Sequence, residues 1–438
     1  MKCLGLDIGS TSLKGCVLDL EARKLSPIVG APFPMPVAGL LPGRFEIDPE
    51  LVLEEVQTLL GRLLKSAPDA EAIYFCGQMA GVVLVDMDGK PLGNYLSWRD
   101  QRTLGPHPEG GNYLDAIARR WTSGELAELG NELKPGSTSS LLFWLADHGQ
   151  MPAGLMPATL GDFVAARLAG VPPRIEPTQA IGLLDLRTGD WHRAALDRLG
   201  LGGLAWQPLA KANEPIGHWH TQGRKLAIYP VLGDQQCALR GAGLTEGDLS
   251  LNVSTGAQVS QVTKALQLGS HQTRPYFDGQ YLNTITHLPA GRSLNVLVSL
   301  LTELSMAQGV TAANPWPYIA HVAETAEGDG LSCNLAFFPG PMGESGSITG
   351  ITTENFSVGN LFYAAFHNMA QVFEQCAERL CPQQDWKRVV LSGGLTQSVP
   401  VLRRILEARF AGNPPGKVVE SSEREETLAG LLASATGS

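Results

Sequence analysis

The stretch Asp7-Ile8-Gly9-Ser10-Thr11-Ser12-Leu13-Lys14 decides the fold. Apolar residues flank it at 3–6 and 15–18, so the pattern predicts a strand, a tight polar turn and a second strand. Because no helix follows the turn, both common phosphate loops, G-x-x-x-x-G-K-S/T and the helix-opening G-x-G-x-x-G, are excluded. Such a turn still offers N–H and hydroxyl donors to phosphate oxygens, and an acid at the strand end can hold Mg²⁺ through water. The alternative is an ordinary hairpin turn with an aspartate that bonds its own turn.

The second half of the chain repeats this pattern. Residues 249–258 predict another strand, a Ser254-Thr255-Gly256 turn and a further strand. One turn of this kind is usually structural, but two matched turns predict duplicated halves with a cleft in which a triphosphate is held from both sides. The glycines between 241 and 247 mark the boundary, so we expect domains over 1–243 and 244–438.

Helices and strands alternate along the rest of the chain. Asp48 and Pro49 predict a helix start, and apolar residues at helical spacing continue that helix to residue 63. Further predicted helices cover 141–146, 163–168, 361–380, 401–410 and a last stretch around Leu428, and predicted strands cover 73–76, 82–85, 227–232 and 389–391. This alternation is typical of the α/β class.

Composition excludes several classes of protein. The 438 residues carry a net charge of −10, which argues against a nucleic-acid-binding surface and leaves anionic ligands to local N–H groups, Lys or a metal. Seven scattered cysteines without a C-x-x-C pair predict neither a disulfide framework nor a zinc site. No apolar run approaches 18 residues and no signal peptide precedes Asp7, so we expect a soluble, reduced, cytoplasmic protein without a membrane span.

Two further turns follow predicted strands. Gly233-Asp234-Gln235-Gln236 puts an aspartate at the carboxyl end of a strand, where it could accept a proton from a substrate hydroxyl; the alternative is a helix N-cap. The glycines of Ser392-Gly393-Gly394 let a flat ring lie close to the backbone; the alternative is a plain turn between strand and helix.

These motifs in this order, closed by Glu426-Thr427-Leu428-Ala429-Gly430, resemble the FGGY carbohydrate kinases over essentially the whole chain. Segments 75–83, 97–102 and 158–163 are similar to the sedoheptulokinase-like branch. The resemblance implies the two-lobed, actin-like (ribonuclease H-like) α/β fold with a cleft between duplicated lobes. It makes 1–243 a sugar-binding lobe with the phosphate hairpin and the catalytic aspartate, and 244–438 a nucleotide-binding lobe.

The resemblance also implies roles for individual residues. Asp234 would be the catalytic base, and Asp7 and Asp234 would flank the Mg²⁺ of the bound ATP. The phosphates and the adenosine would contact Gly9, Ser10, Thr11, Ser12, Lys14, Thr255, Gly256, Gly393, Gly394 and Gln397. The sugar pocket would be lined by Gln78, Met79, Trp98, Asp100 and Gln235.

The reaction that this implies is ATP-dependent phosphorylation of a ketose hydroxyl, with sedoheptulose or ribulose as the first candidates. Alternatives are another substrate of the family (xylulose, glycerol or a tetritol) and a nucleotide-binding protein without catalysis. Ala80 stands where a His is common, and 137–144 lacks a polar or Lys position of many relatives, so the substrate is less determined than the reaction. The expected partners are the sugar and ATP, without nucleic acid or membrane, and a homodimer is left open.

Overall fold

The chain divides into two compact units in the computed structural model, which describes residues 1–310, 314–411, 417–421 and 423–437. Unit 1 comprises Met1–Gly243, Lys264–Tyr281 and Glu423–Ser438, and unit 2 comprises Leu244–Thr263 and Leu282–Ser422. The first segment of unit 1 ends where the sequence places the boundary. The prediction that everything after residue 243 forms one domain is wrong, because two later segments pack into unit 1.

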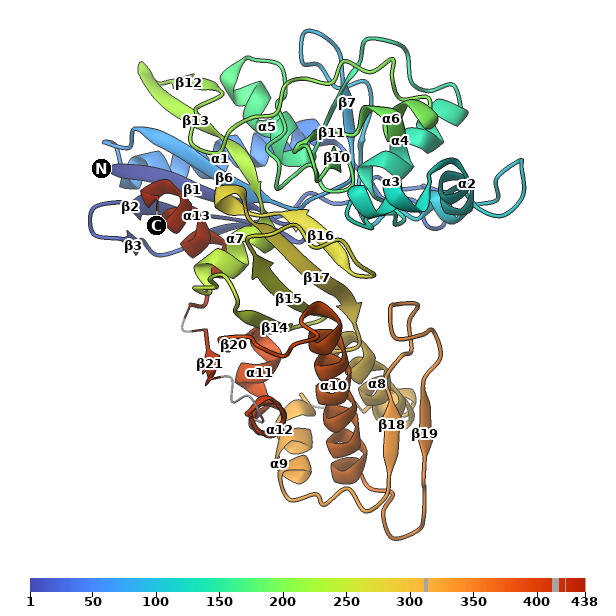
Figure 1. Cartoon of the computed structure of the whole chain (residues 1–438). Helices are drawn as coiled ribbons and strands as arrows, with labels where there is room; N and C mark the ends of the chain where they lie inside the picture. The colour runs from blue at the N-terminus through green and yellow to red at the C-terminus, as the bar shows by residue number, and fades with distance from the viewer. Residues whose placement is uncertain (311–313, 412–416, 422, 438) are drawn as a thin grey trace. The chain divides into compact units, whose positions relative to one another are not determined.

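Unit 1 is built on a seven-stranded sheet (Figure 1). The predicted hairpin is present as β1 (Lys2–Ile8) and β2 (Ser12–Asp19), which pair antiparallel. Two strands run parallel to β1, first β6 (Ala72–Gly77) and then β13 (Arg224–Gly233). The edges are formed by β12 (Gly217–Thr221), β3 (Lys24–Leu25) and β4 (Val29–Pro32). The strand order is therefore β12-β13-β6-β1-β2-β3, with β4 against β2.

One face of this sheet is covered by α1 (Pro49–Ser66) and α5 (Leu160–Ala169). Helix α1 begins as the sequence predicts: the Asp48 side chain accepts the Glu50 N–H at 2.9 Å, and proline occupies the first turn. Its apolar stripe packs with Leu6, Phe75 and Val231 of the sheet in one buried core. Burying a stripe of this kind is what stabilises an amphipathic helix on a sheet.

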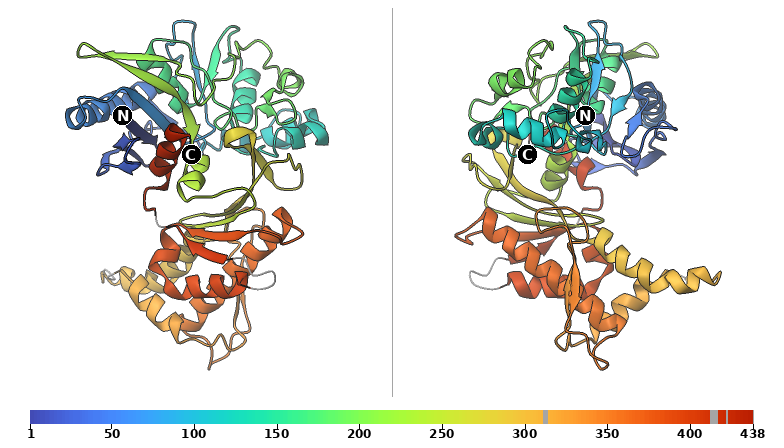
Figure 2. Two further views of the ribbon diagram at one scale, coloured as in Figure 1. Left: turned by 60° about the vertical axis from the view of Figure 1, so that its left-hand side comes forward. Right: turned by 90° about the vertical axis from the view of Figure 1, so that its right-hand side faces the viewer.

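The opposite face carries α7 (Asp234–Gly241) and α13 (Glu426–Thr436), two helices far apart in the chain that lie side by side (Figure 2, left). Their backbones almost touch. A Cβ on Gly430 would lie 1.9 Å from the Cys237 carbonyl oxygen, and a Cβ on Gly241 would lie 1.9 Å from that of Glu426. This contact explains why the last segment of the chain belongs to unit 1.

The rest of unit 1 consists of shorter elements, some of which surround a separate core that includes Tyr113, Trp144 and Trp191. Its helices are η1 (Arg102–Leu104), α2 (Tyr113–Arg120), α3 (Ser123–Glu128), α4 (Thr138–Asp147), α6 (Arg193–Arg198) and η2 (Phe277–Gly279). Its strands are β5 (Glu46–Ile47), β7 (Val83–Val85), β8 (Tyr95–Leu96), β9 (Met156–Ala158), β10 (Leu184–Asp185), β11 (Asp190–Trp191) and β16 (Gln272–Pro275).

Unit 2 repeats the hairpin theme on a smaller scale. Strands β14 (Leu249–Val253) and β15 (Ala257–Thr263) pair antiparallel, and β20 (Arg388–Ser392) and β21 (Lys417–Glu420) continue the sheet in parallel. Strand β17 (Tyr281–Leu288) lies next to β15. The predicted long helix is α10 (Val358–Leu380), whose buried stripe forms the core. The other elements are α8 (Gly291–Ala307), α9 (Trp316–Glu324), β18 (Ser332–Asn334), β19 (Ser347–Thr349), α11 (Gly394–Ser398) and α12 (Pro400–Phe410).

All seven cysteines are buried free thiols. Within the described ranges, no helix combines the length and the apolar character that crossing a bilayer requires.

Candidate functional site

The candidate site lies at the carboxyl ends of β1, β6 and β13. In register, Asp7 pairs with Cys76 and Cys76 with Leu232, one position before Gly233. Neighbouring strands are about 4.8 Å apart, so the backbone at Asp7 and the end of β13 are separated by about 10 Å. Asp234 follows β13 directly and is the first residue of α7. The sheet therefore brings together two aspartates that are far apart in sequence.

The pKa values of both carboxyl groups are shifted, and the charge of Asp7 contributes to the shift of Asp234. Burial raises the pKa of Asp7, opposed by the Thr427 hydroxyl, which donates to Asp7 Oδ2 at 2.8 Å. Burial, and then the charge of Asp7, raise the pKa of Asp234 to about 7. The Gln235 N–H, which donates to Asp234 Oδ1 at 2.7 Å, opposes that shift. Asp234 is therefore a carboxylate that can exchange a proton near neutral pH.

The turn between β1 and β2 is held from two directions. Gln78 Nε2 donates to the Gly9 carbonyl oxygen at 3.3 Å. Lys14 Nζ pairs with Glu425 Oε2 at 2.7 Å, while Thr11 is exposed. Glu425 belongs to the acidic run before the last helix, and its carboxylate partly neutralises Lys14. Ser10 and Ser12 flank Thr11 and are half-buried.

The five predicted sugar contacts lie in different surroundings. Gln78 is buried and held by Gly9 and by the Tyr95 hydroxyl, which lies 3.4 Å from Gln78 Oε1. Met79 lies beside the end of β13, since a Cβ on Gly233 would be 2.8 Å from its sulfur. Trp98 is 38% exposed and is free to contact a ligand.

Asp100 is the exception among the predicted sugar contacts. It is fully buried, and both of its carboxylate oxygens accept internal hydrogen bonds. The Phe45 N–H donates to Oδ2 at 2.7 Å, and Arg102 donates to both oxygens at 2.9 Å. Arg102 also pairs with Glu46 at 2.6 Å. A direct sugar contact of Asp100 does not fit this arrangement; its carboxylate instead fixes residues 45 and 102.

Gln235, the fifth predicted sugar contact, belongs to a buried ionic network. Its Oε1 accepts from Arg274, whose Nε also pairs with Glu132 at 2.5 Å. Lys134 lies 3.8 Å from Glu132, and burial lowers its pKa to about 8. Sequence reasoning missed this network, because Glu132 and Arg274 are 142 residues apart and neither stands in a motif.

Unit 2 brings its own two motifs together. A Cβ on Gly393, whose φ is +92°, would lie 2.4 Å from the Val253 carbonyl oxygen and 2.7 Å from Ser254 Oγ. Asn252 Nδ2 also donates to Ser392 Oγ at 2.9 Å. The predicted phosphate turn and the predicted adenosine turn are therefore neighbours, with Thr255, Gly256, Gly394 and Gln397 all exposed.

The acidic pair fits a hard divalent cation. Asp7 Oδ1 is buried and has no hydrogen-bond partner, so one oxygen of this carboxylate is left for a ligand. In the described part of the chain, no group of three or more His, Cys, Asp or Glu side chains forms an all-protein metal site. Mg²⁺ is commonly held by one or two carboxylates together with water and substrate phosphates, which matches this donor set.

Thr427 and Glu425 are two site residues to which sequence reasoning assigned no role. Both precede or open α13, near the end of the chain, yet each contacts the first hairpin. For Thr427 an indication was present in the sequence, because this residue belongs to the last of the motifs, residues 426–430. Only the packing of α13 against α7 shows which residues they meet.

Known proteins share this fold. A xylulose kinase of Staphylococcus xylosus is 24% identical over 329 residues, a match that covers 68% of this chain and 64% of that relative. The match thus spans less than two thirds of that relative's length. The crystal structure of a xylulose kinase from Rhodospirillum rubrum superposes with a TM-score of 0.83 at 20% identity, covering 100% of this chain and 91% of that one.

A Plasmodium falciparum glycerol kinase solved with ADP gives a TM-score of 0.81 at 17% identity, covering 99% of this chain and 88% of that one. These likenesses confirm the predicted actin-like α/β fold. The family model described as the N-terminal domain of the FGGY family of carbohydrate kinases matches residues 2–241, more than half of the chain. The chain therefore belongs to the FGGY family of carbohydrate kinases.

Proposed function

We propose that this protein transfers the γ-phosphoryl group of ATP to a hydroxyl of a ketose or a related polyol. The observation that carries the proposal is the pair Asp7 and Asp234, which the sheet register brings to one edge. The effect of the Asp7 charge on the pKa of Asp234 supports their closeness. A protein that only binds nucleotide would have no need of a second acid with a pKa near 7.

In this proposal Asp234 is the general base. Phosphoryl transfer to an alcohol requires the hydroxyl proton to be accepted while the oxygen attacks in line. A carboxylate with a pKa of about 7 is ionised in half of the molecules at neutral pH and is a stronger base than an exposed aspartate. The Gln235 N–H fixes one carboxylate oxygen, so the other is available to the substrate.

Asp7 would hold Mg²⁺ through its free oxygen, with Asp234 close by. The metal would neutralise charge on the transferred phosphoryl group. We assign phosphate contacts to Gly9, Ser10, Thr11, Ser12, Lys14, Thr255 and Gly256, and adenosine contacts to Gly393, Gly394 and Gln397. For Lys14 this role requires that its pairing with Glu425 be shared with the phosphate.

For the sugar, Gln78, Met79, Trp98 and Gln235 are the proposed contacts, and Asp100 acts indirectly through Phe45 and Arg102. Sedoheptulose and ribulose are our first candidate substrates, as the sequence resemblance implies. Xylulose is the second, favoured by the names of the matched relatives. We keep a cytoplasmic location and a homodimer as expectations.

The test is ADP release with Mg²⁺–ATP and a panel of ketoses and polyols that includes sedoheptulose, ribulose, xylulose, glycerol and a tetritol. Stimulation by one of them supports the kinase and identifies the substrate. Binding of ATP without stimulation by any of them would favour the non-catalytic alternative.

A further inference from the structure

A chain of hydrogen bonds runs from Glu176 to the residue before Asp234. The backbone N–H of Thr178 donates to Glu176 Oε2 at 2.7 Å, and the Thr178 hydroxyl donates to the same oxygen. The Gly233 N–H then donates to Thr178 Oγ1 at 2.9 Å. All of these groups are buried. Glu176 and Thr178 thus reach the last peptide of β13, next to Asp234.

The direction of these bonds is fixed by chemistry. A hydroxyl has one proton to donate and lone pairs to accept. Because Glu176 Oε2 acts as acceptor, the Thr178 proton must point to it, which leaves a lone pair for the Gly233 N–H. Without the carboxyl group the hydroxyl would be free to turn, and the buried N–H would lose a defined acceptor.

Neighbouring side chains tie the same segment to the strand ends. Gln179 Nε2 donates to the carbonyl oxygens of Gly77 at 3.0 Å and Leu232 at 2.9 Å. Gln236 Nε2 donates to the Thr178 carbonyl oxygen at 3.4 Å. Residues 176–179 therefore bridge β6, β13 and the first turn of α7, the elements that position Asp234.

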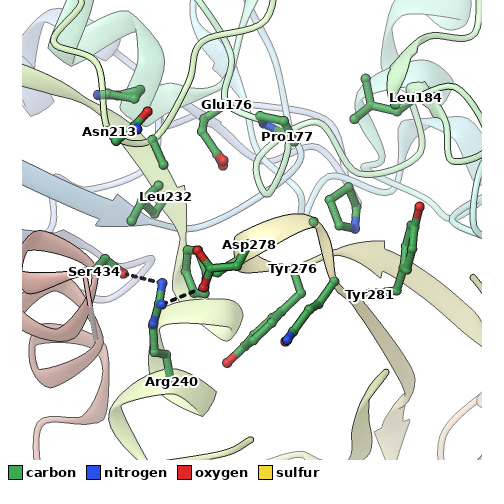
Figure 3. A pocket seen from close by; sticks show the side chains of 18 of the residues that line it. Glu176, Pro177, Leu184, Asn213, Leu232, Arg240, Tyr276, Asp278, Tyr281 and Ser434 are labelled. Atoms are coloured by element: carbon green, nitrogen blue, oxygen red, sulfur yellow. Dashed lines mark hydrogen bonds and ion pairs between the residues drawn. The ribbon is translucent and has the colours of Figure 1, made fainter. Parts of the chain in front are cut away.

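Glu176 also lines a pocket of about 540 Å³ on the side of β13 away from α1, together with Leu232, Tyr276 and Asp278. Figure 3 shows its carboxyl end directed into this pocket. The second carboxyl oxygen is thus free to carry a proton while Oε2 stays an acceptor. Burial raises the pKa of Glu176 to about 7. Oε2 can accept the Thr178 proton whether or not the other carboxyl oxygen is protonated.

We propose that Glu176 and Thr178 are positioning residues for the reaction, which hold the Gly233–Asp234 peptide so that the Asp234 carboxylate meets the substrate hydroxyl. This inference rests on the proposed function, since it assigns a purpose to the orientation of Asp234. Neither residue touches substrate. They act through the backbone, so their loss lowers turnover more than it weakens binding.

The experiment uses the full chain and compares, at each of the two positions, a variant that removes the hydrogen-bonding group with a variant that keeps it. Thr178→Val removes the hydroxyl and Thr178→Ser keeps it; Glu176→Leu removes the acceptor and Glu176→Gln keeps one. A base misplaced by about 1 Å can lose roughly 10²-fold in rate, so we expect kcat to fall by about 10- to 100-fold for Val and Leu. The KM values for ATP and sugar should stay within about threefold, and Ser and Gln should restore most of kcat.

Two further measurements separate this role from general destabilisation. In the Asp234→Asn background, Thr178→Val should cost no further kcat, because it acts only through that carboxylate. Amide hydrogen exchange at Gly233 and Asp234 should be faster in Thr178→Val and Glu176→Leu than in the natural chain. Wild-type kcat and exchange in Thr178→Val, or a full additional loss in the double variant, would overturn the inference.

The exchange measurement also keeps the two proposals distinguishable. If Asp234→Asn turns over normally or no sugar is phosphorylated, the proposed function fails. Faster exchange of the Gly233 and Asp234 amides in Thr178→Val would still support the chain of hydrogen bonds from Glu176 through Thr178 to Gly233. If Thr178→Val does not fold, judged by circular dichroism, kcat and amide exchange are compared between Glu176→Leu, which removes the acceptor, and Glu176→Gln, which keeps it.

Discussion

The Thr427 hydroxyl donates a hydrogen bond to Asp7 Oδ2 at 2.8 Å, across 420 residues of chain. The bond joins the first strand to the last helix and occupies one oxygen of the carboxylate. The other oxygen, Oδ1, is left buried and unpaired. Thr427 thereby determines which oxygen of Asp7 stays without a partner, and the last helix contributes a side chain to the candidate site.

Replacing this threonine should weaken Mg²⁺ binding at the proposed site. A hydrogen bond to a charged group contributes about 1.5–3 kcal/mol, so Thr427→Val should raise the Mg²⁺ concentration for half-maximal turnover by at least about tenfold. Thr427→Ser keeps the hydroxyl and should stay close to the natural protein. A Mg²⁺ titration of turnover at saturating ATP checks this, and equal half-maximal concentrations for Val and Ser would contradict it.

The turnover number should rise with pH through about 7. As the proposed base, Asp234 would accept a proton only when ionised, and burial together with the charge of Asp7 raises its pKa to about 7. Below that value kcat should fall about tenfold per pH unit, because the protonated fraction grows. In Asp7→Asn the neighbouring charge is gone, so the same acid limb should move to lower pH in the activity that remains. A limb that stays in place would show that Asp7 does not influence the base.

Because of Asp162, we expect the stability of the fold to depend on pH. Burial raises the pKa of Asp162 to about 8, and its Oδ1 has no hydrogen-bond partner. A carboxyl group with a raised folded-state pKa is most favourable below its unfolded pKa, and its contribution is lost as pH rises toward the folded value. Between about pH 4 and 8 this group alone should lower the free energy of unfolding by up to about 1.4 kcal/mol per pH unit.

Asp162→Asn imitates the protonated form and should remove that slope. The variant should be more stable than the natural protein at pH 8, with little difference near pH 4. Urea denaturation across this pH range measures the effect. If the free energy of unfolding changed with pH in the same way for both proteins, Asp162 would have to be ionised in the folded state.

Alanine substitutions at Gly393 and at the next residue, Gly394, provide a matched comparison, because the space around their Cβ positions differs. At Gly393, the φ of +92° and the 2.4 Å approach of a Cβ to the Val253 carbonyl oxygen leave no room for a side chain. Gly393→Ala should therefore destabilise the fold by at least about 1 kcal/mol and raise the KM for ATP. Gly394 has nothing within 4 Å of its Cβ position, so Gly394→Ala should leave the midpoint of thermal unfolding unchanged. Equal unfolding midpoints for the two variants would refute the packing argument.

Local patterns in the sequence predicted much of the fold. The hairpins at residues 7–14 and 249–258, the start of α1 at Asp48 and the long helix α10 depend on alternation, caps and helical spacing, which neighbouring residues determine. The return of residues 264–281 and 423–437 to unit 1 depends on contacts between distant segments. Local patterns carry no information about such contacts.

The candidate site divides in the same way. The positions of Asp7 and Asp234 were predictable because each stands at the carboxyl end of an apolar strand, and parallel strands align their carboxyl ends. The partners that adjust them, such as Thr427 and Thr178, are single hydroxyls whose role depends on where other segments pass. Asp100 shows the opposite failure: its motif predicted a ligand contact, whereas its buried carboxylate is fully engaged by Arg102 and Phe45.

The most direct test of the central claim is the sugar-dependent turnover of Asp234→Asn, measured as ADP release with Mg²⁺–ATP and the best substrate from the panel. Loss of a general base costs about 10²–10⁴ in rate, so kcat should fall by that factor while the KM for the sugar stays nearly unchanged. Turnover equal to that of the natural chain would contradict the assignment of Asp234 as the base.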